Sequence, residues 1–594
     1  MAATKIGNLR KLMQQHHLDA YVVPGTDQHQ NEYLPALWKR REWISGFTGS
    51  AGTVVVTREL AGLWTDFRYY LQAEQQLAGS GIVLFRLGQP DVPDPWQWLA
   101  MELEPGMRVG IDPRLITARK AAHVLKMFRP GGLNLQFLED NLVDRIWENR
   151  PGLPLRPAVP HPESCSGEPV VSKLQRLRTE LEKRHCAVIV LSKLDSIAWL
   201  YNLRGTDIAF NPVVIAYALV TQTTASLFIS PGQVTAELEQ HLAGLVEICK
   251  YTDFKGTLTE YNRRKLSFLV DDTHNSAWVT SLIDGDRLFT GTCPVIYFKA
   301  VKNTIEIKNF QQAHIRDGVA LVKFLFWLEQ AVPAGGVTEA SAAEKLRQFR
   351  MEQAMYREES FPAISAYKDH AAIVHYDLEG KQGYTLESVG LYLIDSGAHY
   401  LDGTTDITRT IALGEPTTEQ QENFTRVLKG HIDLAQCSFP EGTQGIQLDA
   451  IARKPLWDHG LDYGHGTGHG IGSYLNVHEG PHAISQARGV LVKLQPGMFC
   501  SNEPGYYKAG EYGIRIENIV YIARDEDKSS AGQVFYKFKT ISLCPIDLRL
   551  VKKTMLSPGQ LAFLNAYHQV VRQQLSPFLD TVQQNWLDQA TRPL

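Results

Sequence analysis

The sequence predicts an α/β protein of several domains, and three observations support this prediction. The chain has 594 residues, whereas single hydrophobic cores stop growing near ~250–300 residues. Short apolar runs alternate with helical patterns, which is typical of three-layer α/β domains. The first half also contains a weak internal repeat. We therefore expect two related α/β domains followed by a larger third domain.

The repeat consists of two segments with the same order of features. Each has a Leu-x-x-Leu helical pattern, an apolar run and a Trp-led turn that ends in glycine. The apolar runs are 20–23 and 187–190, and the turns are 43–49 and 199–205. Any two α/β domains share helix-then-strand order, so only the matched Trp and Gly positions favour duplication. The two interpretations stay about equally supported.

Two boundaries divide the chain. A proline-rich stretch at 150–162 is typical of a linker. A second boundary falls near 302–304, and apolar residues beyond it recur at steps of 4, 3 and 4, as in an amphipathic helix: Ile315, Val319, Val322 and Phe326. We place the domains at 1–160, 161–302 and 303–594, the last ending in a helical extension.

Composition excludes several classes of protein. The net charge is −4 and no Lys/Arg block stands out, which disfavours a nucleic-acid-binding protein. Apolar stretches such as 213–220 are shorter than the ~20 residues of a membrane helix, and the N-terminus lacks the apolar core of a secretory signal. Seven scattered cysteines without a Cys-x-x-Cys pair indicate a reduced, cytoplasmic protein.

Asp395 and Asp406 flank a turn-prone segment between two apolar, β-branched runs, which predicts a hairpin. If its midpoint lies near Tyr400, the two carboxylates lie opposite each other, an arrangement that normally destabilises a sheet. A lone Asp beside glycine usually forms a turn instead. A metal ion between the two would remove the repulsion.

The segment 464–472 has glycine at every second position and contains His465 and His469. Each glycine costs a helix ~1 kcal/mol relative to alanine, so we expect an extended chain. At ~3.3 Å per residue, the two histidines lie ~13 Å apart and cannot bind one metal. One is a candidate ligand, and the other a candidate contact along a bound substrate. A phosphate-binding loop is disfavoured because the Gly-x-Gly-x-x-Gly and Lys-Ser/Thr patterns are absent.

Two further carboxylates follow. Glu503 precedes a Pro-Gly turn, and Glu517 shares one face of a predicted strand over 513–520 with Arg515. Alone, Glu503 would be a solvated loop carboxylate, and Arg515 and Glu517 would form an exposed ion pair. Together, four carboxylates and one imidazole match the charge of two divalent ions, since without metal they would repel. This ligand set suits Mn²⁺, with Co²⁺, Zn²⁺ and Fe²⁺ left open, and such a pair generates hydroxide at neutral pH.

Four motifs, in this order and spacing, resemble the aminopeptidase P (Xaa-Pro aminopeptidase) family of pita-bread metallopeptidases, in its three-domain cytosolic form. They are His-Gly-Thr-Gly-His-Gly-x-Gly from 465, Asn-Val-His-Glu-Gly-Pro from 476, Glu-Pro-Gly-Tyr-Tyr from 503 and Gly-Ile-Arg-Ile-Glu-Asn from 513. The resemblance covers nearly the whole chain. It implies two creatinase-like α/β domains before an α+β pita-bread catalytic domain. It also implies a homodimer that releases the first residue from peptides with proline second.

The resemblance further implies a role for each site residue. Asp395 would bind one metal, His469 and Glu503 the other, and Asp406 and Glu517 both. Hydroxide activated by the ions would attack the peptide carbonyl while Glu503 moves the proton and His478 stabilises the oxyanion. The implied substrate contacts are Arg68, His375, His465, His478 and Arg515.

One segment departs from the family pattern. A Gly-Pro-Asn-Gly-like stretch is expected before His375, but the chain has Tyr367-Lys368-Asp369-His370. The shape of this loop and the preferred peptide length therefore stay open. Two alternatives remain: a prolidase, which uses the same five ligands but is usually shorter, and a non-enzymatic pita-bread binding module, which typically loses ligands.

Overall fold

The computed structural model describes residues 2–378, 380–487, 491–530 and 532–594. The chain forms two units. Unit 1 comprises Met1–Pro162 with Glu168–Ile296, and unit 2 comprises Glu163–Gly167 with Tyr297–Leu594. Because both predicted N-terminal domains fall within unit 1, the boundary near 160 stays a prediction. The mixed α/β class is confirmed.

The first sheet of unit 1 is centred on β1 (Ala20–Pro24), which pairs antiparallel with β2 (Thr53–Thr57) and parallel with β5 (Arg108–Ile111). The strand order is β4-β3-β2-β1-β5-β6. The remaining strands are β3 (Ala61–Thr65), β4 (Val83–Arg86) and β6 (Asn134–Phe137). The β-branched run in β2 favours strand formation, and its three central valines are buried.

The second sheet repeats this pattern around β8 (Val188–Leu191) in the order β12-β11-β10-β8-β13-β14. Each strand pair has the same relative direction as its counterpart in the first sheet. The other strands are β10 (Ala216–Thr221), β11 (Ala225–Ile229), β12 (Glu247–Lys250), β13 (Phe268–Val270) and β14 (Leu288–Thr290). The shared topology supports duplication over mere similarity of class.

The Trp-led segments are not the turns expected from sequence. Trp43 lies in helix α2 (Arg40–Ser45), and Trp199 lies in helix α9 (Leu194–Leu200). Gly46 ends α2 with a φ of 81°, the left-handed conformation in which glycine commonly terminates helices. The prediction of a turn that begins at each Trp was therefore wrong, because both Trp residues lie in short helices.

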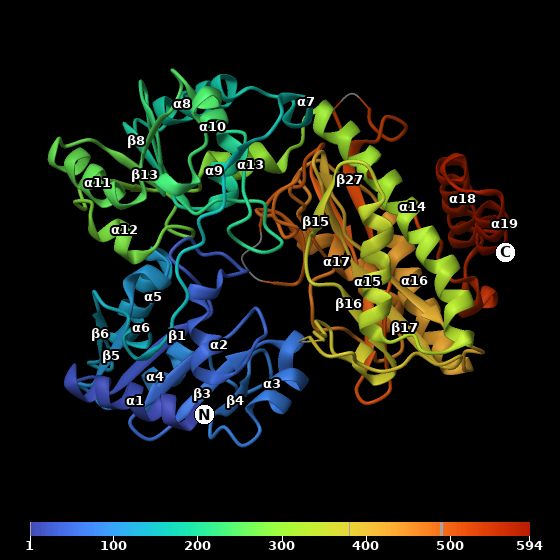
Figure 1. Cartoon of the computed structure of the whole chain (residues 1–594), viewed down its shortest axis with the longest axis horizontal. Coiled ribbons are helices and arrows are strands. Elements are labelled where there is room, and N and C mark those ends of the chain that lie inside the picture. The colour runs from blue at the N-terminus through green and yellow to red at the C-terminus, as the bar shows by residue number, and fades with distance from the viewer. Residues whose placement is uncertain (1, 379, 488–490, 531) are drawn as a thin grey trace. The chain divides into compact units, whose positions relative to one another are not determined.

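The helices of unit 1 pack apolar faces against these sheets; α1, for example, buries Ile6, Leu9 and Met13. Figure 1 shows these elements in blue to green. The other principal helices are α3 (Tyr70–Leu77), α4 (Pro95–Glu102), α5 (Ala118–Phe128), α6 (Leu142–Ile146), α8 (Val170–Lys183), α10 (Ala236–Leu242), α11 (Phe254–Arg263) and α12 (Ala277–Ser281), with α1 spanning Ala2–Gln15.

Unit 2 begins its main body with the long helix predicted after residue 303. Helix α14 (Thr304–Ala334) starts at Asn303, which forms a reciprocal capping box with Glu306. Val319 and Val322 are buried as the apolar spacing predicted. Helix α15 (Glu339–Met351) packs beside α14 (Figure 1).

The strands of unit 2 form small antiparallel sheets. The sheet that carries Asp395 has the order β16-β17-β20, and a four-stranded sheet has the order β21-β28-β27-β24. Their strands are β16 (Ile364–Tyr367), β17 (Leu391–Ser396), β20 (Ile407–Ala412), β21 (Ser438–Pro440), β24 (Phe499–Asn502), β27 (Asn518–Arg524) and β28 (Phe535–Thr540). A third sheet joins β15 (Tyr356–Glu359), β18 (Ala398–Tyr400) and β19 (Gly403–Thr404).

Helices α16 (Thr418–Ala435) and α17 (Gly445–Trp457) pack together in unit 2. The predicted C-terminal helical extension is present as α18 (Pro558–Leu575) and α19 (Thr581–Ala590). It is part of the core, because Leu564, Val571 and Leu587 are at most 1% exposed.

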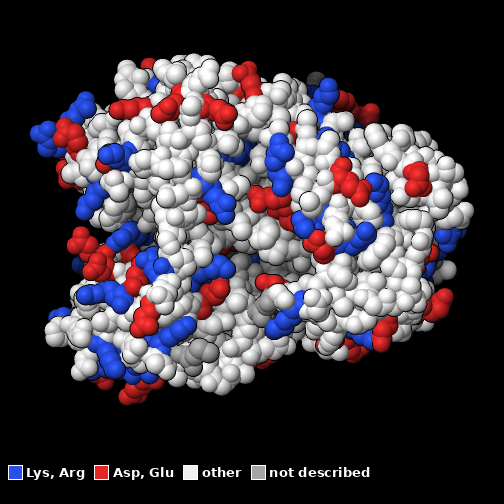
Figure 2. Space-filling view, viewed as in Figure 1, with Lys and Arg blue, Asp and Glu red and all other residues white. Residues whose placement is uncertain are grey.

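Three sequence expectations concern the molecule as a whole. All seven cysteines are free thiols. Within the described residues, no helix is long and apolar enough to span a membrane. Basic and acidic side chains are interspersed over the face drawn in Figure 2, in keeping with the near-neutral net charge of −4.

Candidate metal centre and active site

Asp395 and Asp406 lie beside a hairpin whose register differs from the predicted one. Asp395 of β17 faces Thr408 of β20, so the midpoint lies between residues 401 and 402 and not at Tyr400. Asp406 is two positions before Thr408 and therefore lies diagonal to Asp395. The prediction of directly opposed carboxylates was wrong by two residues, although both side chains share one face.

Three of the candidate ligands converge closely. Single ligand atoms of Asp406, His469 and Glu517 all lie within 4.8 Å of one another. His469 lies in β22 (Gly468–His469), and its Nε2 is 3.4 Å from Asp406 and 3.5 Å from Glu503. Glu503 follows β24, so four ligand candidates from four separate segments meet at this point.

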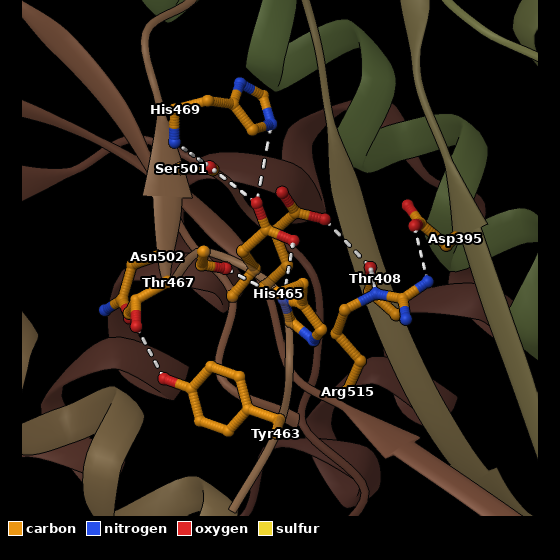
Figure 3. A network of polar contacts seen from close by, with 12 residues as sticks. Asp395, Thr408, Tyr463, His465, Thr467, His469, Ser501, Asn502 and Arg515 are labelled. Carbon is orange, nitrogen blue, oxygen red and sulfur yellow. Dashed lines mark hydrogen bonds and ion pairs between the residues drawn. The ribbon is translucent and has the colours of Figure 1, made fainter. Parts of the chain in front are cut away.

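Asp395 completes the cluster from β17. Its Oδ2 accepts a hydrogen bond of 2.6 Å from Arg515 Nη2 (Figure 3). Its Oδ1 is buried without a hydrogen-bond partner among the described residues. Leaving a buried carboxylate oxygen unpaired is costly, so this atom is available for a cation.

The electrostatics of the cluster show strong mutual repulsion. Burial raises the pKa of Asp395 to about 6, and the charges of Asp406 and Glu503 add to this rise although Arg515 opposes it. Burial and neighbouring carboxylates also raise the pKa values of Glu503 and Glu517. For His469, burial lowers the pKa, but Asp406 and Glu503 outweigh it and raise it to about 9. An oxygen-rich set with one imidazole fits two divalent ions.

The glycine-rich segment is less extended than expected. Only Gly468 and His469 form a strand, and the residues before them are irregular. His465 Nδ1 lies 4.0 Å from Glu503, and His469 Nε2 lies 3.5 Å from the same carboxylate. The expected separation of ~13 Å for an extended chain therefore does not describe the side chains, which converge on Glu503.

An arginine of α17 explains this shape. Arg453 donates hydrogen bonds to the carbonyl oxygens of Tyr463 (2.6 Å) and His465 (2.7 Å). Asp449 accepts a 2.6 Å bond from Thr467 and pairs with Arg453. The Tyr463 and Thr467 hydroxyls also meet (Figure 3). These contacts bend the chain before β22.

Glycine is required where the segment meets its neighbours. A Cβ atom at Gly468 would lie 2.0 Å from the carbonyl oxygen of Ser501, and one at Gly470 would lie 2.0 Å from that of Glu479. The alternation of glycine thus permits close backbone approach.

Two residues that the sequence did not single out join the site. Thr408 donates to Glu517 (2.8 Å) and accepts from Arg515 Nε (3.1 Å). The Tyr507 hydroxyl contacts both Arg515 Nη1 (2.7 Å) and His465 Nε2 (2.8 Å). The sequence contained a clue to both residues, because each lies within or next to a segment that carries a candidate ligand.

Arg515 differs from the ordinary exposed charge considered above. It is only 2% exposed and lies at the end of β26 (Tyr512–Arg515), which pairs with β25 (Gly505–Lys508). The predicted strand over 513–520 is interrupted at Ile516 and Glu517, and β27 then begins at Asn518. This interruption allows Glu517 to reach the cluster.

The other predicted substrate contacts have different surroundings. The ring of His478 lies 4.4 Å from that of His469, at 81°. His375 is half-buried beyond the 3₁₀ helix η6 (Lys368–Ala372), which packs against β26. Arg68 belongs to unit 1, in η2 (Phe67–Tyr69), and pairs with Asp66 at 2.7 Å. No contact tests the substrate roles, which stay predictions.

The atypical loop before His375 is held by a set of contacts that we call the His370 clamp: Glu339, His370, Tyr376 and Tyr384. Glu339 is fully buried and accepts from His370 Nδ1 (2.9 Å) and from the backbone N–H of Tyr384 (2.7 Å). The His370 ring stacks on Tyr376 and Tyr384 at 4.4 and 3.8 Å. The loop has a defined framework despite its departure from the expected sequence.

Comparison with known proteins agrees with this geometry. Residues 308–524 match metallopeptidase family M24, and residues 534–594 match the C-terminal region of that family. Residues 5–135 and 149–306 each match the creatinase/prolidase N-terminal domain. The two N-terminal matches agree with the repeated topology of unit 1.

Full-length relatives are similar over nearly the whole chain. Aminopeptidase P2 of Arabidopsis thaliana is 40% identical, with 99% of this chain and 88% of the relative covered. A probable Xaa-Pro aminopeptidase P of Pyrenophora teres is also 40% identical, with 99% and 92% covered.

Among solved structures, X-prolyl aminopeptidase of Caenorhabditis elegans, described as a cytosolic enzyme with a di-nuclear active site, has a TM-score of 0.96. It is 36% identical, and both chains are covered completely. With these similarities and a candidate ligand cluster in the matched region, the chain belongs to the aminopeptidase P group of metallopeptidase family M24.

Proposed function

We propose that the protein is a metal-dependent aminopeptidase that releases the first residue from peptides with proline in the second position. The observation that carries this proposal is the buried cluster in which ligand atoms of Asp406, His469 and Glu517 lie within 4.8 Å. Its setting in a chain 40% identical to aminopeptidase P relatives directs the chemistry to Xaa-Pro bonds.

The proposed ligand roles follow the family resemblance. Asp395 would bind one ion, His469 and Glu503 would bind the other, and Asp406 and Glu517 would bind both. The buried, unpaired Oδ1 of Asp395 supports this assignment. Mn²⁺ is the proposed metal, because four carboxylates and one imidazole form an oxygen-rich set.

The protein residues then have distinct tasks. Two divalent ions, when bound, would activate water at neutral pH and polarise the peptide carbonyl. Glu503 accepts the proton of the attacking water and transfers it to the leaving proline nitrogen. His478, next to His469, donates a hydrogen bond to the developing oxyanion. Arg515 and Thr408 hold Asp395 and Glu517 in place.

Substrate selection requires a site that accepts a proline ring. Proline forms a tertiary amide without an N–H, so a hydrogen bond from that group cannot contribute to recognition. We assign His375, His465 and Arg515 to substrate binding, and we propose a substrate contact for Arg68 of unit 1 as well. The proposal also includes a homodimer, a cytoplasmic location and the domain limits 1–160, 161–302 and 303–594.

A metal count combined with a peptidase assay tests the function. Purified protein should contain two divalent ions and release alanine from Ala-Pro-Ala. Exhaustive chelation should abolish this release, and Mn²⁺ should restore it. Ala-Ala-Ala is the matched control and should be a poor substrate. Full activity in metal-stripped protein would contradict the mechanism.

The same assay separates the prolidase alternative. An aminopeptidase that accepts longer peptides should cleave Ala-Pro-Ala efficiently, whereas a prolidase requires the dipeptide Ala-Pro. Cleavage of the dipeptide alone would replace the proposal with the prolidase. If neither peptide is cleaved although two ions are bound, the binding-module alternative gains support.

A further inference from the structure

A buried group of three charged side chains includes Glu479, the residue that follows His478. Glu479 pairs with Lys302 at 2.5 Å and with Lys299 at 2.9 Å, and the three side chains are at most 1% exposed. We call this group the Lys–Glu–Lys triad. Two lysines therefore contact one buried carboxylate. Ion pairs of this kind are poor sources of stability and are better at fixing one arrangement of the chain.

The triad connects segments that are far apart in the sequence. Lys299 and Lys302 both lie just before α14, while Glu479 lies in the loop after β22. The Lys302 backbone N–H donates to Gly497, and Val301 bridges Met498, so the lysine segment also borders the start of β24. Glu503 follows that strand.

The loop that carries His478 is closed on the ligand segment. The Glu479 backbone N–H donates to Gly470, the residue after His469, at 2.8 Å. A Cβ atom at Gly472 would lie 3.0 Å from Glu479 Oε2, so the carboxylate itself fills the inside of the loop. Moving Glu479 would therefore move the backbone that joins it to His478.

We propose that Glu479, held between Lys299 and Lys302, is a positioning residue that fixes His478 beside the metal cluster. This inference rests on the proposed function, in which His478 stabilises the oxyanion. The triad acts through His478 and does not touch the substrate. Its loss should lower kcat while the bound metal and KM change little.

A double-mutant cycle in the Mn²⁺-loaded enzyme tests the coupling. Glu479→Gln should lower kcat on Ala-Pro-Ala by about 10-fold or more, and by no more than the ~10²–10³-fold expected for complete loss of an oxyanion donor. In the His478→Ala background, Glu479→Gln should have almost no further effect, because the group that it positions is gone. Losses that multiply would overturn the proposal, as would loss of a metal ion in Glu479→Gln.

Lys302→Met is the second variant, because it leaves Glu479 in contact with Lys299. It should show a smaller kcat loss with the same dependence on His478. Asp317→Asn is the matched control, since it breaks another buried ion pair of unit 2, with Arg350 at 2.9 Å. Asp317→Asn and His478→Ala should act independently. The kcat loss of this double variant should therefore equal the product of the two single losses.

Hydrogen exchange tests the role of the triad independently of peptidase activity. Lys302→Met should speed hydrogen exchange in residues 470–482, whereas Asp317→Asn should leave that segment unchanged. Unchanged exchange in Lys302→Met would overturn the triad's role even in an active enzyme. Faster exchange in a protein that lacks peptidase activity would support the positioning role of the Lys–Glu–Lys triad and reject the proposed function.

Discussion

His469 is the one imidazole among the proposed ligands, and its removal tests the assignment directly. His469→Ala should lower the metal content from two ions to one or none, because its Nε2 lies 3.4 and 3.5 Å from two ligand carboxylates. Elemental analysis after gel filtration measures this. His465→Ala is the control and should retain both ions. Two ions bound to His469→Ala would contradict the assignment.

Asp395 makes the stability of the metal-free protein depend on pH. Its folded pKa of about 6 lies above the ordinary 3.8, so the folded state binds the extra proton between these values. Protonation of Asp395 therefore contributes fully to the free energy of unfolding below pH ~4. This contribution, up to about 3 kcal/mol, is lost as the pH rises through 6. Asp395→Asn should flatten this fall.

Urea unfolding of the metal-free proteins at pH 4.5 and 7.5 measures the effect. The difference between the two pH values is the readout, because Asp395→Asn also weakens the contact with Arg515 and lowers stability at every pH. An equal pH dependence in wild type and Asp395→Asn would show that Asp395 does not carry the effect.

Residue identity was easier to predict than residue surroundings. The ligand candidates were recognisable because clustered carboxylates beside glycine-rich motifs have few structural explanations. For Arg515 the sequence left two interpretations, a substrate contact and an exposed ion pair with Glu517, since a strand alternation does not show whether its polar face is solvated. Its exposure of 2% excludes the exposed pair. Thr408 and Tyr507 were missed because hydroxyl groups become informative only when their partners are known.

At the scale of elements, register was the main error. The hairpin of Asp395 and Asp406 was predicted, but Asp395 faces Thr408, two residues beyond the expected partner. A turn can shift along a polar segment at little local cost, so sequence fixes it poorly. The extended conformation predicted for the glycine-rich segment was wrong for a related reason, because Arg453, twelve residues before His465, bends it.

The His370 clamp predicts a loop-specific effect. His370→Ala should loosen the segment before His375 and raise KM for Ala-Pro-Ala several-fold, because it removes two ring stacks and a bond to buried Glu339. Metal content should not change. Lys368→Ala, which removes the exposed pair with Glu387 and a contact with the Tyr367 ring but no contact of the clamp, is the control. Equal kinetics in wild type and His370→Ala would show that the loop does not depend on the clamp.

Helix α19 should contribute to stability through its buried face. Leu587 is 0% exposed, so Leu587→Ala should lower the free energy of unfolding of unit 2 by ~2–5 kcal/mol. Val582 on the same helix is 62% exposed, and Val582→Ala should change it by ~0.5 kcal/mol or less. Denaturant unfolding distinguishes them, and equal losses would contradict the packing of α19.

At the scale of the whole molecule, metal should stabilise one unit selectively. All five proposed ligands belong to unit 2, and a ligand that binds only the folded state raises its unfolding temperature. Calorimetry should show two transitions, of which Mn²⁺ raises only one. Equal shifts of both transitions would contradict the assignment of every ligand to unit 2.

The architecture of the whole chain was the most predictable level. Chain length, the linker prolines and four ordered motifs indicated several domains and a metallopeptidase, and the family comparisons confirmed both. Duplication could not be settled from sequence, because a matched Trp and Gly are weak evidence. The identical strand order of the two sheets supplied what was missing.

That repeated topology also shows how the two halves have diverged. In the first sheet, β3 is followed by η2, where Asp66 and Arg68 form an ion pair. At the corresponding turn of the second sheet, β11 is followed by η4 (Pro231–Gln233), with Gly232 in the place of Arg68. If both halves descend from one ancestral domain, only one copy carries a cation at this turn. If Arg68 contacts substrate as proposed, only the first of the two related domains can supply this contact.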